Sequence, residues 1–186
     1  PAPTAHDDAF AAYQWGLDQG YAASSIALVG DSAGGNLALA TAIRVRDEGL
    51  PMPACVALMS PALDLAGEGD SNKSEAGAPL LTRELMGLFN MMYVGDGDLK
   101  SPRVTPFYSD LSGLPPILIH VGSWELLRDD SVTTASRIEA AGGSATLKVW
   151  QGMCHSWQLF APMLDEGMAS IEETGAFIQQ HFEPNA

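Results

Sequence analysis

The sequence predicts an α/β fold of three layers, with a sheet of parallel strands between two layers of helices. Short apolar runs of strand length alternate with longer segments of helix length along the 186 residues. The run at 54–59 is apolar throughout and that at 117–121 nearly so, which is typical of strands buried on both faces of a parallel sheet. Because strands that alternate with helices are joined by parallel crossovers, one domain of this class is expected over 1–186.

The elements are predicted in a regular order. Thr4 is expected to cap the first helix and Gly20 to end it. The elements expected after it are a strand at 26–29, a helix at about 33–48, strands at 54–59 and 117–121, a helix at about 127–141, an edge strand at 145–150 and a last helix. That last helix carries one apolar stripe, which is made of Met168, Ile171, Gly175, Ile178 and Phe182.

Residues 64–110 interrupt this alternation and are predicted to form a cap or loop excursion. The excursion begins with a stretch rich in Gly, Ser and acidic residues, which is typical of a loop. An amphipathic, Met-rich helix is predicted at 82–93. Its apolar side chains would either pack as ordinary core or line a pocket, where adaptable methionines suit a loosely held ligand.

The composition is strongly acidic, with 9 Lys and Arg against 23 Asp and Glu and a net charge of -14. This charge argues against nucleic acid and anionic lipid as partners, because both bind basic surfaces. The sequence has no apolar run long enough to span a membrane. Cys55 and Cys154 lack the spacing of a metal site or a disulfide framework, and two free thiols fit a reducing, cytoplasmic compartment.

The stretch from Ser25 to Leu37 carries the clearest chemical signal. It joins an apolar strand to a helix through the sequence Gly-Asp-Ser-Ala-Gly at 30–34. A Gly-x-Ser-x-Gly sequence in this position is a nucleophile elbow, a strained turn that presents the serine hydroxyl above the sheet. Gly30 and Gly34 are expected to let strand and helix pass closely, because they lack Cβ atoms. Ser32 is therefore the predicted nucleophile.

A serine hydroxyl needs an adjacent base, and His155 is the best placed of the four histidines. It follows the last predicted strand, at the carboxyl edge of the sheet, which matches the order serine, acid, histidine of such sites. Glu125 lies just beyond the preceding strand and is the predicted acid that orients the imidazole. Asp129 and Asp130 are alternatives for this acid.

The oxyanion of an acyl-transfer intermediate needs hydrogen-bond donors that are already in place. The backbone N–H of Ala33, directly after the predicted nucleophile and at a helix N-terminus, is one expected donor. A second donor normally comes from an earlier loop of the His-Gly-Gly-Gly type, and the sequence contains no such loop. Cys154 is an alternative nucleophile beside His155, but the serine elbow explains that histidine better.

These motifs resemble those of the hormone-sensitive-lipase-like (bacterial family IV) carboxylesterases, which have the α/β-hydrolase fold. The resembling segments are GDSAGGNLA at 30–38, GLPP at 113–116, ELLRDD at 125–130 and HSW at 155–157. Glu125 occupies the acid position, where most members have Asp. The resemblance implies hydrolysis of short- to medium-chain carboxylic esters through an acyl-enzyme, with a cap over the pocket and no metal or other cofactor.

The resemblance also implies partners. Members of the family carry the oxyanion-loop glycines and their first strands upstream of the elbow, whereas this sequence starts after them. We expect an N-terminal fragment of the same enzyme, bearing the Gly-rich loop, to pack against the chain, because the elbow strand would otherwise expose apolar surface. The family often forms dimers through the last strand and helix, so a homodimer is a further expectation.

Six side chains are candidates for the substrate pocket, although large apolar residues more often fill the core. They are Asp31, Leu88, Met92, Trp124, Trp157 and Phe160. Two other functions stay open, because a fold does not fix a function. The first is a non-catalytic α/β-hydrolase scaffold that binds a small molecule, and the second is a serine hydrolase that acts on amides or lactones.

Overall fold

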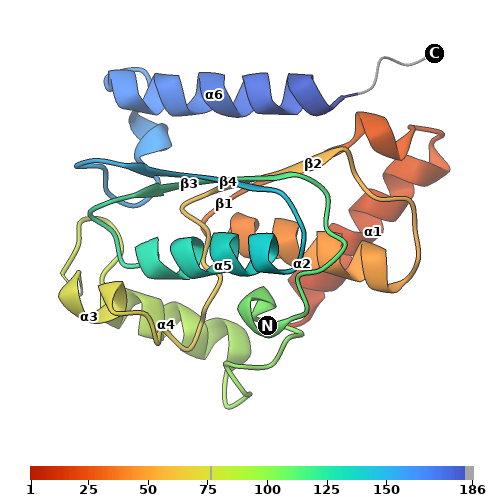
Figure 1. The fold of residues 1–186 in the computed structure, drawn as a ribbon. Coiled ribbons are helices and arrows are strands. Elements are labelled where there is room, and N and C mark those ends of the chain that lie inside the picture. Colours follow the sequence, from red (N-terminus) through yellow and green to blue (C-terminus); the bar gives the residue numbers. More distant parts are fainter. Residues whose placement is uncertain (76, 183–186) are drawn as a thin grey trace.

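The computed structural model describes residues 1–75 and 77–182, which form a parallel sheet with helices on both faces (Figure 1). The strands, in their order across the sheet, are β1 (Ala27–Asp31), β2 (Cys55–Met59), β3 (Ile117–Gly122) and β4 (Ala145–Trp150). The helices are α1 (Thr4–Asp18), α2 (Ala33–Asp47), α3 (Ser71–Ser74), α4 (Arg83–Val94), α5 (Arg128–Ala140) and α6 (Asp165–His181), with short 3-10 turns at Ala23–Ser25, Pro106–Tyr108 and Trp157–Phe160. The predicted α/β class is confirmed.

Helices cover both faces of the sheet, and the loops that follow its strands lie together at one edge. Among the described helices, α6 covers one face of the sheet, while α2 and α5 cover the other, with α1 packed on α2 (Figure 1). Helices α3 and α4, from the 64–110 segment, lie beyond that second layer (Figure 1). Since all four strands are parallel, the loops that follow them meet at the same carboxyl edge.

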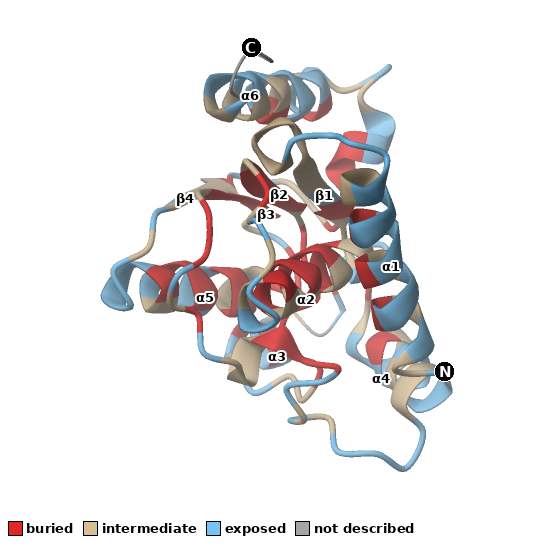
Figure 2. Cartoon of the chain, turned by 90° about the vertical axis from the view of Figure 1, so that its right-hand side faces the viewer, coloured by how far each residue is buried: buried red, intermediate tan, exposed pale blue. Residues whose placement is uncertain are grey.

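The core lies between the sheet and the second helical layer. Strands β2 and β3 are buried along nearly their whole length because each has a strand on both sides and a helix on both faces (Figure 2). Leu58 and Ile119 of these strands pack against Leu39 of α2 and Ile138 of α5. This continuous apolar contact explains why 54–59 could be recognised as a buried strand from its sequence.

Helix α6 does not pack on the sheet through its apolar stripe. Its face toward the sheet is formed by small residues, Gly167, Ser170 and Thr174, whereas Met168 and Ile171 are each 43% exposed. The sheet explains this choice, because β3 presents His120, whose Nδ1 lies 2.8 Å from Oγ of Ser170. A buried imidazole needs a polar partner, so the helix docks with this small-residue face. Met168, Ile171 and Phe182 of the stripe stay exposed, while Gly175 and Ile178 are half-buried.

The start of α1 also differs from its predicted form. Thr4 is the first residue of the helix, Pro3 occupies the N-cap position, and there is no side-chain cap. At the start of α4, by contrast, the Oγ1 of Thr82 accepts the backbone N–H of Leu85 at 3.2 Å. A side-chain cap therefore supports the helix of the excursion, and none supports α1.

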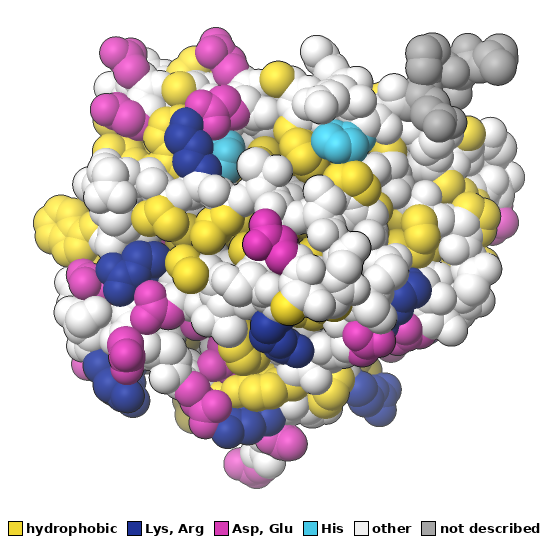
Figure 3. Space-filling model, in the orientation of Figure 1, with side chains coloured by type: hydrophobic (Ala, Val, Ile, Leu, Met, Phe, Trp, Pro, Cys, Tyr) yellow, Lys and Arg dark blue, Asp and Glu magenta, His cyan; other side chains and the backbone are white. Residues whose placement is uncertain are grey.

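The surface carries its charges in mixed form. On the face shown in Figure 3, Lys and Arg side chains are interspersed with Asp and Glu and do not gather into a basic patch. None of the helices within 1–75 and 77–182 is both long enough and apolar enough to cross a bilayer.

Candidate active site

Ser32 lies at the sharp turn between β1 and α2. Its backbone has φ 54° and ψ -117°, a strained conformation for a residue with a side chain. A Cβ on Gly30 would lie 2.1 Å from the carbonyl oxygen of Gly34, and one on Gly35 would lie 2.6 Å from Cβ of Pro61. A Cβ on Gly34 would meet nothing within 4 Å. The close approach therefore requires Gly30 and Gly35, and the predicted role of Gly34 is wrong.

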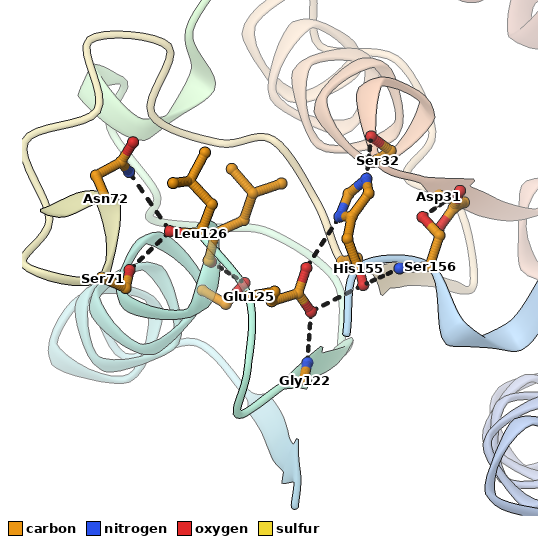
Figure 4. A network of polar contacts seen from close by, with 12 residues as sticks. Asp31, Ser32, Ser71, Asn72, Gly122, Glu125, Leu126, His155 and Ser156 are labelled. Carbon is orange, nitrogen blue, oxygen red and sulfur yellow. Dashed lines mark hydrogen bonds and ion pairs between the residues drawn. The ribbon is translucent and has the colours of Figure 1, made fainter. Parts of the chain in front are cut away.

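Three side chains form a continuous line of hydrogen bonds at the carboxyl edge of the sheet (Figure 4). Oγ of Ser32 lies 2.9 Å from Nε2 of His155, and Nδ1 of His155 lies 2.9 Å from Oε2 of Glu125. His155 is 8% exposed and Glu125 is fully buried. When Nδ1–H donates to the carboxylate, Nε2 remains as an acceptor for the serine hydroxyl.

The carboxylate of Glu125 is fixed from its other side as well. Its Oε1 accepts hydrogen bonds from Oγ of Ser60, at 2.9 Å, and from the backbone N–H of Gly122. Oγ of Ser60 in turn accepts the backbone N–H of Ser156 at 3.1 Å. A buried carboxylate needs such partners, and with them Glu125 is held toward His155.

Ser60, which directly follows the strand predicted at 54–59, is a site residue that the sequence analysis does not identify. The structure gives Ser60 a φ of 43°, at the end of β2 and close to Glu125. Ser60, Glu125 and His155 follow three successive strands of the sheet, as Ser32 follows the first. The position directly after a strand was therefore a usable signal for Ser60 as well.

Asp31 joins the elbow to the loop of His155. Oγ of Ser156 donates to the Asp31 carboxylate and lies 2.9 and 3.0 Å from its two oxygens. Burial raises the pKa of Asp31, while the hydrogen bond from Ser156 and the nearby His155 oppose this shift. Asp31 therefore fixes the loop, and its predicted place in the pocket is corrected accordingly.

The two alternative acids point to other partners. A side-chain oxygen of Asp129 accepts the backbone N–H of Ser71 at 2.8 Å, and one of Asp130 accepts that of Asp64 at 3.3 Å. Both hydrogen bonds tie α5 to the 64–75 segment. The structure thus brings Glu125, and neither aspartate, to the imidazole of His155.

The buried carboxyl group of Asp130 should make the free energy of unfolding depend on pH. Burial, followed by the neighbouring Asp64, raises the pKa of Asp130 from its ordinary value of 3.8 to about 8. The folded state then holds a proton that the unfolded state has lost, so stability falls as pH rises from about 4 to 8, by up to about 1.4 kcal/mol per pH unit. We expect Asp130→Asn to remove this loss. The free energy of unfolding of the variant should therefore rise relative to that of the wild type between pH 5 and pH 9.

Urea unfolding at pH 5, 7 and 9 measures this effect. Asp129→Asn is the matched control, because it changes the neighbouring carboxylate, which is more exposed and paired with Arg128. A difference between Asp130→Asn and the wild type that is the same at all three pH values would contradict the assignment of a protonated Asp130.

Ala33 is the first residue of α2, so its N–H has no partner within the helix. It lies at the positive end of the helix dipole, directly beside Ser32. This is the position that the sequence analysis expected for one oxyanion donor.

A cavity of about 340 Å³ adjoins Ser32. Its walls are mainly apolar and come from α1, α2, the loop after β2 and α4. The lining residues are Ala5, Ser32, Ala33, Asn36, Leu37, Ala62, Leu65, Leu81, Met86, Phe89, Asn90 and Tyr93. The Met-rich helix predicted at 82–93 thus contributes to the cavity, but through Met86, Phe89, Asn90 and Tyr93.

The predicted pocket residues need correction. Leu88 and Met92 lie on another face of α4 and are 45% and 69% exposed. Trp157 is fully packed against Trp150, and Trp124 and Phe160 lie on the surface. Amphipathicity located α4, but it did not show which of its faces turns toward Ser32, because apolar side chains lie on both.

The other thiol and imidazole groups are placed elsewhere. Burial raises the pKa of the Cys154 thiol, which disfavours the reactive thiolate. His120 lies beneath α6, and Nδ1 of His181 lies 2.8 Å from the carbonyl oxygen of Phe177 on the same helix. His6 lies beside the cavity and bonds to Asn36.

Comparison with known proteins shows the family of this chain. A family model described as the alpha/beta hydrolase fold matches residues 1–159. The chain belongs to this family. Solved structures that are similar to it include proteins of the hormone-sensitive lipase family.

Three similar proteins illustrate the match. An acetyl-hydrolase of Streptomyces hygroscopicus is 40% identical over 181 residues, which are 96% of this chain and 60% of that protein. A crystal structure of an esterase from the bacterial hormone-sensitive lipase family has a TM-score of 0.95 at 40% identity and covers 98% of this chain and 62% of its own. A structure of EstE5 soaked with p-nitrophenyl butyrate has a TM-score of 0.92 at 41% identity, with the same coverage. The chain spans about three fifths of the length of these relatives.

Proposed function

We propose that this chain carries the reacting groups of a serine carboxylesterase for short- to medium-chain esters. One observation supports this above all others: Ser32, His155 and Glu125 are linked by two hydrogen bonds of 2.9 Å in the order nucleophile, base, acid. The names of similar proteins, an acetyl-hydrolase and several esterases, support the same reaction class.

In the proposed mechanism, Oγ of Ser32 attacks the ester carbonyl carbon while Nε2 of His155 takes its proton. The carbonyl oxygen becomes an oxyanion, which the N–H of Ala33 stabilises. Glu125 keeps Nδ1–H of the imidazole oriented and stabilises its charge without taking the proton. The intermediate then expels the alcohol, which receives the proton from His155, and leaves an acyl group on Ser32. Water, deprotonated by His155, releases the acid in the second half of the reaction.

The cavity beside Ser32 supports an acyl group of limited size as substrate. Its walls are mostly apolar side chains, and its volume of about 340 Å³ lies near the lower end of small-molecule sites. We propose that the acyl chain lies there, along α2 and beneath α4.

A second oxyanion donor is proposed to come from outside residues 1–186. It would lie on a Gly-rich segment that packs near Ala33, in the same polypeptide or in a separate fragment. Within the described sheet, β1 is an edge strand and its Val29 is 47% exposed, so this side has room for such a neighbour. We further propose that a homodimer forms through β4 and α6, as the family resemblance implies.

Turnover of a substrate panel tests the proposed function. The protein, in the length in which it occurs naturally, should hydrolyse p-nitrophenyl acetate, butyrate and octanoate, with a burst when deacylation is slow. Equal or faster turnover of matched anilides or lactones would favour an amidase or lactonase. If no ester, anilide or lactone is turned over but the corresponding carboxylic acids bind, the result would favour the non-catalytic scaffold.

A further inference from the structure

A second cavity, also of about 340 Å³, lies further along α2 than the cavity beside Ser32. The first cavity is lined by Asn36 and Leu37 of this helix, and the second by Ala40, Thr41 and Arg44, one to two turns further along. Pro3 and His6, at the start of α1, line the second cavity on its other side. The two cavities therefore follow each other along α2, the first on the side of α4 and the second on the side of residues 102–109.

The imidazole of His6 lies at the boundary between these two cavities. His6 lines the second cavity, whereas its two hydrogen-bond partners, Asn36 and Tyr93, line the first. Nε2 of His6 lies 3.0 Å from Oδ1 of Asn36, and the hydroxyl of Tyr93 lies 2.7 Å from Nδ1 of His6. His6 is only 7% exposed. The ring of His6 thus links Asn36 on α2 to Tyr93 on α4 through two hydrogen bonds.

The hydrogen bonds fix the orientation of all three side chains. Nδ2 of Asn36 donates to the carbonyl oxygens of Ala62, at 2.8 Å, and Val104, at 3.1 Å, so its Oδ1 must face His6. Nε2–H of His6 therefore donates, and Nδ1 of the neutral ring accepts the Tyr93 hydroxyl. Burial lowers the pKa of His6, which favours this neutral form, although Asn36 and Asp7 oppose the shift.

We propose that His6 is a specificity-determining residue, because its imidazole separates the cavity beside Ser32 from the second cavity and so limits the acyl chain. This inference rests on the proposed function. In the wild type, a growing acyl chain fills the first cavity and then meets the layer formed by Asn36, Tyr93 and His6. Without the imidazole, the two spaces join and a longer chain can continue along α2.

The hydrophobic effect gives the size of the expected change. Each methylene that is newly buried contributes about a fourfold gain in kcat/KM. In His6→Ala, the ratio of kcat/KM for p-nitrophenyl decanoate to that for the butyrate should rise at least tenfold. His6→Gln, which keeps a donor and much of the bulk, should return the ratio to near the wild-type value.

Phe10→Ala is the matched control. Phe10 is a buried side chain one turn further along α1, it lines neither cavity, and it packs against Tyr13 and Val45. Its truncation should lower stability without changing the chain-length ratio. Tyr93→Ala removes the other half of the partition and should also raise the ratio. An unchanged ratio in both His6→Ala and Tyr93→Ala, or an equal rise in Phe10→Ala, would overturn the proposal.

Binding in a Ser32→Ala background separates this proposal from the proposed function. Adding His6→Ala should lower the Kd of decanoic acid, measured by calorimetry, at least tenfold. The Kd of butyric acid should stay within twofold of its value in the Ser32→Ala protein. If no variant hydrolyses esters but decanoic acid binding responds, the esterase assignment fails and the partition stands. If esters are hydrolysed and neither the ratio nor the binding responds, the partition fails alone.

Discussion

Ser32→Ala is expected to lower kcat for p-nitrophenyl butyrate by about 10⁶-fold, because it removes the hydroxyl that His155 is placed to activate. His155 and Glu125 would remain in position, but they would have no hydroxyl to deprotonate. The methyl group fits where the serine side chain stood, so the fold should be retained. Steady-state kinetics and thermal unfolding of the same samples measure both effects.

Ser136→Ala is the control for that experiment. Its hydroxyl lies on α5, exposed and bonded only to the carbonyl oxygen of Val132 among the contacts that the structure describes, so kcat should not change. Turnover of the Ser32→Ala protein within tenfold of the wild type would show that another group attacks the substrate.

Glu125→Gln is expected to lower kcat by about 10⁴-fold with little change in fold. Oε1 of Glu125 accepts two hydrogen bonds, from Ser60 and from the N–H of Gly122, so the amide oxygen of Gln must take that position. The amide nitrogen then faces Nδ1 of His155 and donates to it. This donation selects the tautomer with Nε2 protonated, which cannot accept the proton of Ser32.

Asp129→Asn and Asp130→Asn distinguish Glu125 from the two alternative acids. Both aspartates bond to the 64–75 segment, so their amides should leave kcat within about threefold of the wild type. Kinetics of the three variants under one set of conditions decide the assignment. A large loss in either aspartate variant, with Glu125→Gln still active, would contradict the geometry.

Much of the site's layout follows from sequence order alone. Ser32, Glu125 and His155 each lie within a few residues of the end of a predicted strand, and parallel strands bring such positions to one edge. The serine elbow adds a local signal, since a strained turn needs glycine where backbones approach. Which glycine is needed could not be deduced, because Gly35 is required by Pro61, whose position depends on the path of the chain after β2.

Features that depend on which face turns inward could not be predicted. The apolar stripe of α6 suggested its buried face, but His120 on β3 selected the polar face instead. The cavity residues of α4 were missed for a similar reason, since its apolar side chains lie on more than one face. His6 interacts with Asn36 and Tyr93, which are distant in sequence, and no local pattern marks such a contact.

The central claim is that Ser32, activated by His155, forms a covalent bond to the substrate's acyl group. Treatment with a fluorophosphonate, followed by mass spectrometry of the digested protein, tests it most directly. We predict a single phosphonylated site at Ser32, with a labelling rate that falls at least a hundredfold in His155→Ala. A label on another residue such as Cys154, or a Ser32 rate that does not depend on His155, would contradict the claim.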